Sequence, residues 1–412
     1  MATFRPFRAI RPKSEYAAEV LAPPYDVLDR DEAKAMAQGR PRSFLHVTRS
    51  EIDLPDSVGA YDGAVYERAR DNLRGLLRDG VLVREPAPVF CVYRQSMGGR
   101  AQTGVVGCAS IDEYRDGTIK RHELTRVEKE ADRIRHFDAC GADTEPVFLA
   151  FRDDAGLSSL IDGLTRARPP EFSFTAGDGV GHALWAVGDA DAVEAISSAF
   201  GRIPALYIAD GHHRSASAFK VGMKRREESP GYGGGEGFNF FMAAAFPGSE
   251  LRIMEYNRLV SDLAGMTEEG FLDAISGAFD IGEAGAAACR PAEHEFGLLL
   301  GSGWRLLRAK PESVPEGDAI GSLDVSILQD RLLGPVLGIE DPRTDRRIDF
   351  VGGIRGPGEL ERRVGAGMAA AFALHPVSVA RLMGIADMGL VMPPKSTWFE
   401  PKLGSGLFVH EL

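Results

Sequence analysis

The chain has 412 residues, of which 44% are hydrophobic and 26% are charged, an ordinary globular composition. Its length predicts two or three domains, or one core with large insertions. The formal net charge is −12, from 48 Lys and Arg against 60 Asp and Glu. This negative net charge argues against a protein that coats nucleic acid, but it does not exclude a local phosphate-binding site.

The spacing of the cysteines and the lack of long apolar runs indicate in which cellular compartment the protein is expected. Cys91, Cys108, Cys140 and Cys289 form no C-x-x-C pair, and no histidine stands at zinc-ligand spacing from them. A disulfide framework and a structural zinc site are therefore not expected. No stretch approaches the ~18 apolar residues of a membrane span, and the N-terminus lacks an apolar signal sequence. We expect a soluble, cytoplasmic protein of unspecified oligomeric state.

In the first 200 residues, amphipathic helices alternate with short strands. The pattern predicts helices over 29–38 and 61–79, and two strands that form a hairpin around Met97-Gly98-Gly99-Arg100. The two hairpin strands are predicted over 89–95 and 102–111. The other predicted elements are a short strand with a Pro-Pro turn over 19–28 and strands over 146–151 and 182–187. Residues 112–135 are mostly polar and charged.

The clearest local signal begins at residue 205. A buried strand is predicted over 205–209 and a helix over 215–226, with a glycine-rich loop over 231–237 as a candidate domain boundary. Further strands are predicted over 238–246, 298–300 and 304–308, and helices over 268–278 and 325–333. We therefore predict a mixed α+β fold, with one region over 1–230 and another over 238–412.

Between that strand and that helix stands Asp210-Gly211-His212-His213-Arg214, an arrangement typical of anion binding. The first turn of a helix has free N–H groups and a partial positive charge that attract phosphate. Gly211 would let the backbone approach the phosphate, and the histidines and arginine add donors. Asp210 would cap the helix or hold Mg²⁺. A purely structural turn is the alternative, because Asp-Gly turns and core histidine pairs are common.

Two other segments carry candidate site residues. In residues 121–125, Glu123 is a candidate base or Mg²⁺ ligand, and His122 or Thr125 is a candidate contact to substrate or phosphate. A solvated face with i,i+4 ion pairs is the alternative. Lys395 and Ser396 follow two prolines without the Gly-x-x-x-x-Gly of a P-loop. A contact to substrate and a rigid surface turn are equal interpretations of that pair. The glycine-rich segment 352–358 is interpreted as structural. No nucleophile elbow, H-E-x-x-H or dinucleotide fingerprint is present.

Several of these segments resemble a known family. Residues 208–214 resemble the signature of the ParB/sulfiredoxin-like superfamily, in the form found in ADP- or ATP-dependent free serine kinases. The whole chain resembles a bacterial family catalogued as domain of unknown function 1015. The segments that carry this resemblance are 22–27 (Ala-Pro-Pro-Tyr-Asp-Val), 120–125 (Lys-Arg-His-Glu-Leu-Thr), 129–133 (Lys-Glu-Ala-Asp-Arg), 210–214 and 392–399 (Met-Pro-Pro-Lys-Ser-Thr-Trp-Phe).

The resemblance implies a ParB/sulfiredoxin-like nucleotide-binding core with large insertions, followed by a C-terminal α/β region. It implies a kinase that uses Mg²⁺ and ATP or ADP to phosphorylate free serine or a related hydroxylated metabolite. The residues it assigns are Asp26, then Glu123, as catalytic base; Asp210, Gly211, His212, His213 and Arg214 for phosphate; Tyr25, His122, Lys395 and Ser396 for substrate; and Asp210 and Glu123 for metal.

Phosphoryl transfer needs its carboxylates close to the phosphates, so Asp26, Glu123 and Asp210 are expected to converge in one cleft. Asp26 and Asp210 stand much farther apart in this sequence than the matching motifs do in the small serine kinases. The main alternative function is a nucleotide-binding switch of ParB-like fold without catalysis. A DNA-associated protein is a weaker alternative, because the net charge is negative and no basic cluster is present.

Overall fold

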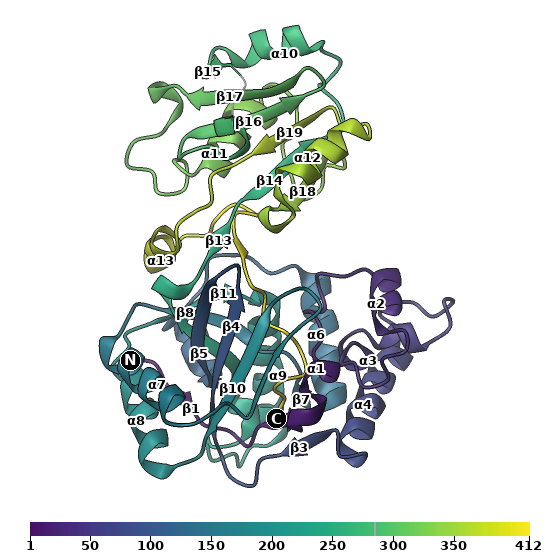
Figure 1. Ribbon diagram of the computed structural model, residues 1–412, viewed down its shortest axis with the longest axis vertical. Coiled ribbons are helices and arrows are strands. Elements are labelled where there is room, and N and C mark those ends of the chain that lie inside the picture. Colours follow the sequence, from purple (N-terminus) through teal and green to yellow (C-terminus); the bar gives the residue numbers. More distant parts are fainter. Residues whose placement is uncertain (284–285) are drawn as a thin grey trace. The chain divides into compact units, whose positions relative to one another are not determined.

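The computed structural model describes residues 1–283 and 286–412, which divide into two compact units (Figure 1). The first unit contains Met1–Leu251 and Pro401–Leu412, and the second contains Arg252–Glu400. Both units combine helices with strands, which confirms the predicted α+β class. The glycine-rich segment 231–237, at which the sequence analysis places the boundary, lies within the first unit. It connects helix α9 (His212–Glu228) to strand β12 (Phe240–Pro247).

The first unit is built around a mixed sheet of nine strands, in the order β6-β11-β8-β12-β5-β4-β10-β9 with β1 paired to β5. Two short ladders, β2 with β3 and β21 with β7, lie outside this sheet. The strands of this unit, besides β12, are β1 (Phe4–Arg5), β2 (Ile10–Pro12), β3 (Leu82–Arg84), β4 (Phe90–Met97), β5 (Arg100–Ser110), β6 (Ile119–Lys120), β7 (Ala142–Asp143), β8 (Val147–Phe151), β9 (Phe172–Thr175), β10 (Gly181–Val187), β11 (Leu206–Asp210) and β21 (His410–Glu411).

The predicted hairpin forms between β4 and β5, which pair antiparallel from Cys91 with Val106 to Met97 with Arg100. Gly98 and Gly99 make its two-residue turn with φ of 57° and 78°. Positive φ at both central positions is what the tight hairpin turn that matches strand twist requires. Local sequence chemistry was therefore sufficient to place this pair of strands.

The helices of the first unit show where the sequence analysis succeeded and failed. Asp29 caps α2 through a capping box with Glu32, and Asp62 caps α4, so both helices begin close to their predicted starts. The strand predicted over 19–28 is wrong, because this segment begins in a short helix. The helices, besides α9, are α1 (Ala17–Val20), α2 (Arg30–Ala37), α3 (Leu45–Thr48), α4 (Gly63–Arg78), α5 (Ile111–Asp116), α6 (Val127–Cys140), α7 (Ala155–Ala167) and α8 (Ala190–Phe200).

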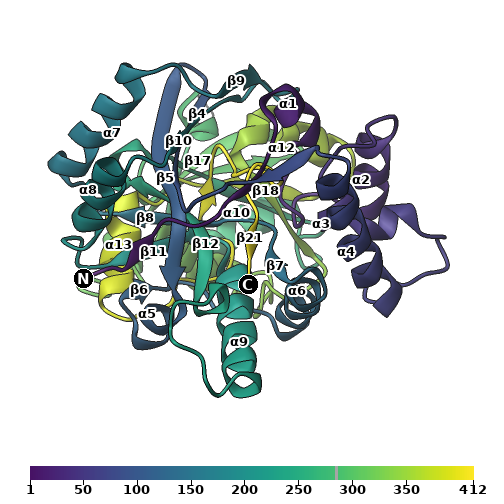
Figure 2. The same ribbon diagram turned by 90° about the horizontal axis from the view of Figure 1, so that it is seen from below.

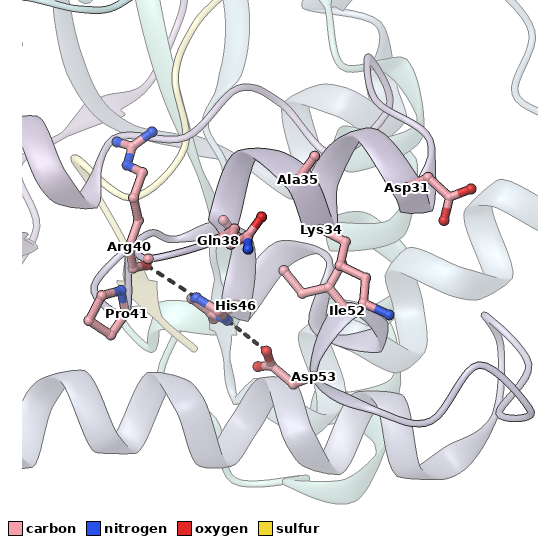
Figure 3. Close-up of a pocket in the computed structure, with 11 residues that line it drawn as sticks. Asp31, Lys34, Ala35, Gln38, Arg40, Pro41, His46, Ile52 and Asp53 are labelled. Carbon is pink, nitrogen blue, oxygen red and sulfur yellow. Dashed lines mark hydrogen bonds and ion pairs between the residues drawn. The ribbon is translucent and has the colours of Figure 1, made fainter.

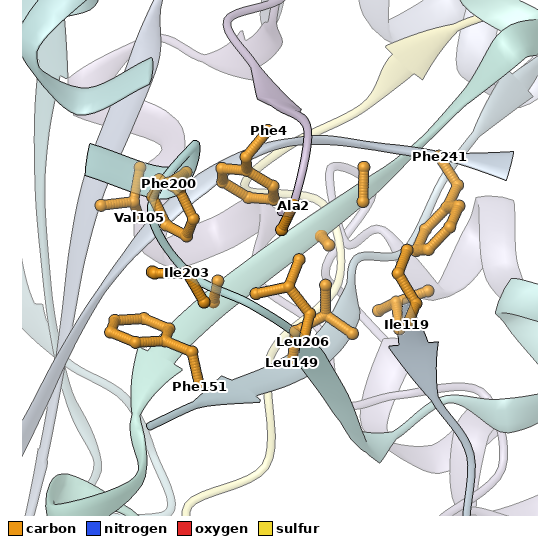
Figure 4. Close-up of a cluster of buried hydrophobic side chains, with 14 of the residues drawn as sticks. Ala2, Phe4, Val105, Ile119, Leu149, Phe151, Phe200, Ile203, Leu206 and Phe241 are labelled. Carbon is orange, nitrogen blue, oxygen red and sulfur yellow. The ribbon is translucent and has the colours of Figure 1, made fainter. Parts of the chain in front are cut away.

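Hydrophobic side chains from the sheet and the helices form the main core (Figure 4). Phe4, Leu149 and Leu206 come from strands, and Phe200 comes from α8. Figures 1 and 2 show α7 and α8 on one flank of the sheet and α2, α3 and α4 on the opposite flank. A second cluster lies under α2, α3 and α4, with Phe44 and Leu45 fully buried. Helix α9 packs against α6, and α6 packs against α4.

The second unit contains a separate antiparallel sheet of six strands in the order β15-β17-β16-β19-β14-β18. Helix α12 packs on β16, β18 and β19, and Leu360 from this helix is fully buried against Leu259 and Val351. The strands are β13 (Ile253–Met254), β14 (Tyr256–Val260), β15 (Phe279–Gly282), β16 (Glu295–Leu300), β17 (Gly303–Ala309), β18 (Ile348–Gly352), β19 (Ala370–Ala373) and β20 (Trp398–Phe399), and the helices are α10 (Glu268–Ile275), α11 (Asp324–Leu328), α12 (Gly356–Gly365) and α13 (Val379–Asp387).

No helix in the described part of the chain combines the length and the apolar character that crossing a membrane requires.

Asp143 on β7 gives the first unit a specific pH dependence. Its carboxylate accepts the N–H of Met242 at 3.0 Å, and burial raises the pKa of Asp143 to about 7 against the effects of Met242 and Arg225. The folded state therefore keeps a proton that the unfolded chain releases near pH 4, so stability falls as pH rises from about 4 to 7.

We expect urea unfolding at pH 4.5 and 7.5 to detect this effect as a comparison with Asp143→Asn. Between pH 4.5 and pH 7.5, the free energy of unfolding of the wild-type chain should fall by more than about 1 kcal/mol relative to that of the variant. If the difference in free energy of unfolding between wild type and Asp143→Asn were the same at both pH values, Asp143 would keep its ordinary pKa in the folded chain.

Candidate functional site

The candidate site forms at the edge of the sheet toward which two paired parallel strands run. β6 pairs with β11 in parallel, with Leu206 opposite Ile119 and Tyr207 opposite Lys120. Because both strands run in the same direction, the segment after Lys120 continues toward the edge of the sheet at which β11 ends with Asp210. This pairing brings together two motifs that are about ninety residues apart in sequence.

The turn after β11 depends on glycine. Gly211 has φ 94° and ψ 32°, and it precedes the first residue of α9. A Cβ at this position would lie 2.9 Å from Nε of Arg214, so a side chain would meet both backbone strain and a buried guanidinium. Gly211 stands at the N-cap position and has no side chain that could cap α9. The first turn of α9 carries the N–H groups and the positive end of the helix dipole that attract an anion.

Asp210 is held between two cations beneath this turn. Its Oδ1 accepts the N–H of Gly211 at 3.0 Å, and its Oδ2 lies 3.4 Å from Nη2 of Arg214 and 3.3 Å from Nζ of Lys402. Burial opposes the charged form of Asp210, but Lys402 and Arg214 outweigh it and hold the pKa of Asp210 below its usual range. The carboxylate is thus kept ionised inside the protein.

Arg214 faces inward rather than toward a ligand. Its side chain is 3% exposed, and Nη1 donates to the carbonyl of Pro146 while Nη2 faces Asp210. In this structure Arg214 supports Asp210 and the glycine turn from below. The phosphate contact predicted for this residue would require these bonds to break.

His122, Glu123 and His212 form a compact group of side chains. Their ligand atoms all lie within 4.8 Å of one another, and the two imidazole rings meet edge to face with centroids 4.5 Å apart. Burial lowers the pKa of His122 to about 4, opposed by Asp210 and by the carbonyl of Ile208. Burial and the neighbouring His122 also lower the pKa of His212 well below its usual value. Both rings are therefore neutral at physiological pH.

His213 and Asp26 lie near the same turn but do not belong to this group. The backbone N–H of Arg126 donates to Nε2 of His213 at 2.9 Å. Burial lowers the pKa of His213, and the nearby charges of Asp26 and Glu130 oppose this effect. The charge of Asp26 also acts on Arg214. Asp26, which is exposed, therefore lies close to the start of α9.

The loop that carries Asp26 is anchored by buried groups. Tyr25 is 4% exposed, and the guanidinium of Arg133 lies 3.9 Å from its ring centroid. The Tyr25 N–H donates to Glu145 at 3.0 Å, and Nη1 of Arg49 donates to the Tyr25 carbonyl at 2.8 Å. These contacts make Tyr25 a support for the loop, and its predicted role in substrate binding stays a prediction.

Lys395 and Ser396 lie in the second unit, where they shape a turn. Lys395 has φ 58°, and its Nζ lies 5.3 Å from the ring centroid of Tyr256. Its carbonyl accepts from Nη2 of Arg258 at 3.0 Å, and the Ser396 hydroxyl donates to the carbonyl of Pro393 at 2.5 Å. Their predicted contact with substrate stays a prediction.

Three residues of the site escaped the sequence analysis. Lys402 lies just after the last family-like segment, and no local pattern marks it. Glu145 and Pro146 precede β8, where Glu145 accepts the N–H of Tyr25 and the carbonyl of Pro146 accepts from Arg214. Such roles depend on contacts between segments that are distant in sequence, so no periodicity or motif could have indicated them.

An open cavity of about 700 Å³ lies elsewhere in the first unit, along α2 and the loop that follows it (Figure 3). Inside it, Nδ1 of His46 pairs with Asp53 at 2.8 Å, and Nε2 lies 3.2 Å from the carbonyl of Arg40. None of the residues that line this cavity belongs to the predicted site, so its size does not bear on the chemistry of that site.

The chain is similar to several solved structures. A free serine kinase in complex with AMP is 12% identical, with coverage of 72% of this chain and 86% of that one and a TM-score of 0.35. A conserved hypothetical protein from Pyrococcus furiosus is 13% identical, with coverage of 74% and 95% and a TM-score of 0.34. SbnI from Staphylococcus aureus, with a C-terminal truncation, is 9% identical, with coverage of 74% and 87% and a TM-score of 0.39.

No curated protein matches the chain. A family model described as protein of unknown function (DUF1015) matches residues 4–326. This match spans well over half of the 412 residues, and the chain belongs to the DUF1015 family.

Proposed function

We propose that this protein is a nucleotide-dependent kinase that phosphorylates a hydroxyl group of a small metabolite. The observation that carries the proposal is the glycine turn before α9, at a helix start where the charge of the exposed Asp26 acts on His213 and Arg214. Phosphoryl transfer needs mainly a positioned donor phosphate, a positioned acceptor and charge stabilisation. The family-like motifs around Asp26 and Asp210 support the same reaction.

The phosphates of ATP or ADP would bind at the first turn of α9. Backbone N–H groups there point toward an anion, and Gly211 permits close approach. The bond from the Arg126 N–H to Nε2 of His213 selects the tautomer that carries its proton on Nδ1. His213 can therefore donate this proton in a hydrogen bond to phosphate without being charged.

In the proposed step, the hydroxyl oxygen of the acceptor attacks the terminal phosphorus of the nucleotide. The bond from that phosphorus to the bridging oxygen breaks, and the hydroxyl proton passes to the carboxylate of Asp26. Free serine is the first acceptor to test. Asp26 suits the role of base because it is exposed and borders the phosphate site.

The predicted magnesium ligands do not make a magnesium site on the protein. Mg²⁺ prefers oxygen ligands in octahedral geometry. Asp210 is paired with Lys402 and Arg214, and Glu123 stands with two imidazoles. We therefore derive no step through a protein-bound Mg²⁺ and expect this ion to arrive with the nucleotide phosphates.

Replacing His213 with alanine should weaken nucleotide binding by about tenfold or more, because one hydrogen bond to a charged phosphate contributes about 1.5–3 kcal/mol. Calorimetric titration with ATP and ADP measures this change. His375→Ala, which alters an exposed histidine of the second unit, is the matched control and should bind like the wild type. Equal affinity in all three proteins would remove His213 from the phosphate site.

The test of the function is a screen for phosphorylated products. The purified chain is incubated with Mg²⁺, with ATP, ADP or CTP, and with a panel of amino acids and hydroxylated metabolites that includes serine. Mass spectrometry should detect a phosphorylated acceptor in at least one mixture. Nucleotide binding without any product would favour the nucleotide-binding switch, and absence of both would contradict a nucleotide site.

A further inference from the structure

We propose that His122, Glu123 and His212 bind a divalent transition metal of the zinc class. Their potential ligand atoms lie within 4.8 Å of one another, and the three residues belong to two segments that the parallel pairing of β6 and β11 holds together. Two imidazoles and one carboxylate are a common ligand set for zinc and its neighbours in the first transition row.

The strongest support is the state of His122. This side chain is 2% exposed, and neither of its ring nitrogens has a hydrogen-bond partner of normal geometry among the described residues. Buried polar groups are rarely left without a partner, because an unsatisfied one costs about 1–3 kcal/mol. The carbonyl of Ile208 acts on the His122 ring without normal hydrogen-bond geometry, so a metal ion would give one of the two nitrogens the partner that it lacks.

His212 also has a ring nitrogen that can become a metal ligand. It is 5% exposed, and its Nε2 receives only a long contact of 3.4 Å from the backbone N–H of His122. Displacing that one weak contact is therefore the main rearrangement that the histidines require.

Glu123 completes the set from the solvent side. Tetrahedral zinc, with bonds of about 2.0–2.2 Å, places its ligand atoms about 3.3 Å apart, so the group must close by roughly 1–1.5 Å. Glu123 is exposed, and a change of its side-chain rotamer can supply much of that movement. Three protein ligands leave at least one coordination position for water or another ligand.

This ligand set distinguishes the proposed ion from magnesium. Imidazole nitrogens suit zinc, cobalt and nickel, whereas magnesium is bound by oxygen atoms. His212 is the first residue of α9, so a metal held here would add positive charge next to the proposed phosphate site. The metal site itself stands on the geometry of the three side chains and does not require that the chain transfers phosphoryl groups.

The experiment uses the full chain stripped of metal and kept free of nucleotide. Calorimetric titration with Zn²⁺, and titration with Co²⁺ followed by visible absorption, should each show one saturable equivalent per chain. Zn²⁺ should bind at least about a hundredfold more tightly than Mg²⁺. Glu123→Gln and His122→Ala should each weaken Zn²⁺ binding by about tenfold or more.

Two controls make the outcome decisive. His213→Gln alters the neighbouring histidine outside the group and should bind Zn²⁺ like the wild type. Thermal unfolding without metal checks that each variant is folded, and Glu123→Gln is the safer variant because its side chain is exposed. Absence of a stoichiometric site, or equal Zn²⁺ affinity in wild type, Glu123→Gln and folded His122→Ala, would overturn the proposal. Because no nucleotide is present, neither result depends on the proposed kinase activity.

Discussion

Replacing Asp26 with asparagine should abolish phosphoryl transfer while leaving nucleotide affinity within a few-fold of the wild type. Asparagine keeps the size of the side chain but cannot accept the hydroxyl proton of the acceptor. Loss of a general base lowers turnover by about 10²–10⁴-fold. Turnover rates from the product assay and dissociation constants from calorimetry separate the two effects.

The matched control for this variant is Asp31→Asn, another exposed carboxylate nearby in the sequence, on α2. It should keep both turnover and binding. Asp26 is exposed, so neither substitution should unfold the chain. If Asp26→Asn lost nucleotide affinity instead, Asp26 would be a binding residue, and the role of base would pass to Glu123. Unchanged turnover would exclude Asp26 from the chemistry.

Replacing Asp210 with asparagine should give the largest loss of stability. The substitution removes the negative charge that compensates Arg214 and Lys402 and leaves two cations facing each other beneath the glycine turn. Breaking a fully buried ion pair costs about 3–5 kcal/mol. The Asp210 side chain is 23% exposed, so we expect the free energy of unfolding to fall by roughly half of that amount, about 2 kcal/mol. Urea unfolding measures the change.

The difference in free energy of unfolding between the wild type and Asp210→Asn should depend on pH. The pKa of Asp210 is lowered in the folded chain, so its stabilising effect is present above the ordinary carboxyl pKa of about 4 and is lost as the pH falls below it. The stability difference between wild type and Asp210→Asn should therefore narrow between pH 6 and pH 3. A difference that stays constant over this range would mean that the charge of Asp210 contributes nothing to folding.

Elements with strong local signals could be predicted from the sequence. The strand before Asp210, the helix after it and the hairpin at Gly98-Gly99 each depend on a few neighbouring residues. Helix α6 could not be recognised in the same way. It buries Glu130, Asp132, Arg133 and His136 together with Phe137, so its inner face is mostly polar and its apolar periodicity is lost.

The candidate site was predictable as a set of motifs but not as an arrangement. The motifs around Asp26, Glu123 and Asp210 stand out in the sequence, and the structure places them around one turn. The inward position of Arg214 and the pairing of Lys402 with Asp210 follow from long-range packing. The gathering of His122 with His212 depends on the two-residue strand β6, which is too short to produce a sequence pattern.

The central claim is that this chain transfers a phosphoryl group at the turn before α9. The most direct measurement follows a label in the terminal phosphate of the nucleotide during a single turnover with saturating acceptor. We predict that the wild-type chain moves the label to the acceptor, that Asp26→Asn binds the nucleotide without moving it, and that His213→Ala requires more nucleotide for the same transfer. Label that remains on the nucleotide in the wild-type reaction, across all acceptors of the panel, would contradict the claim.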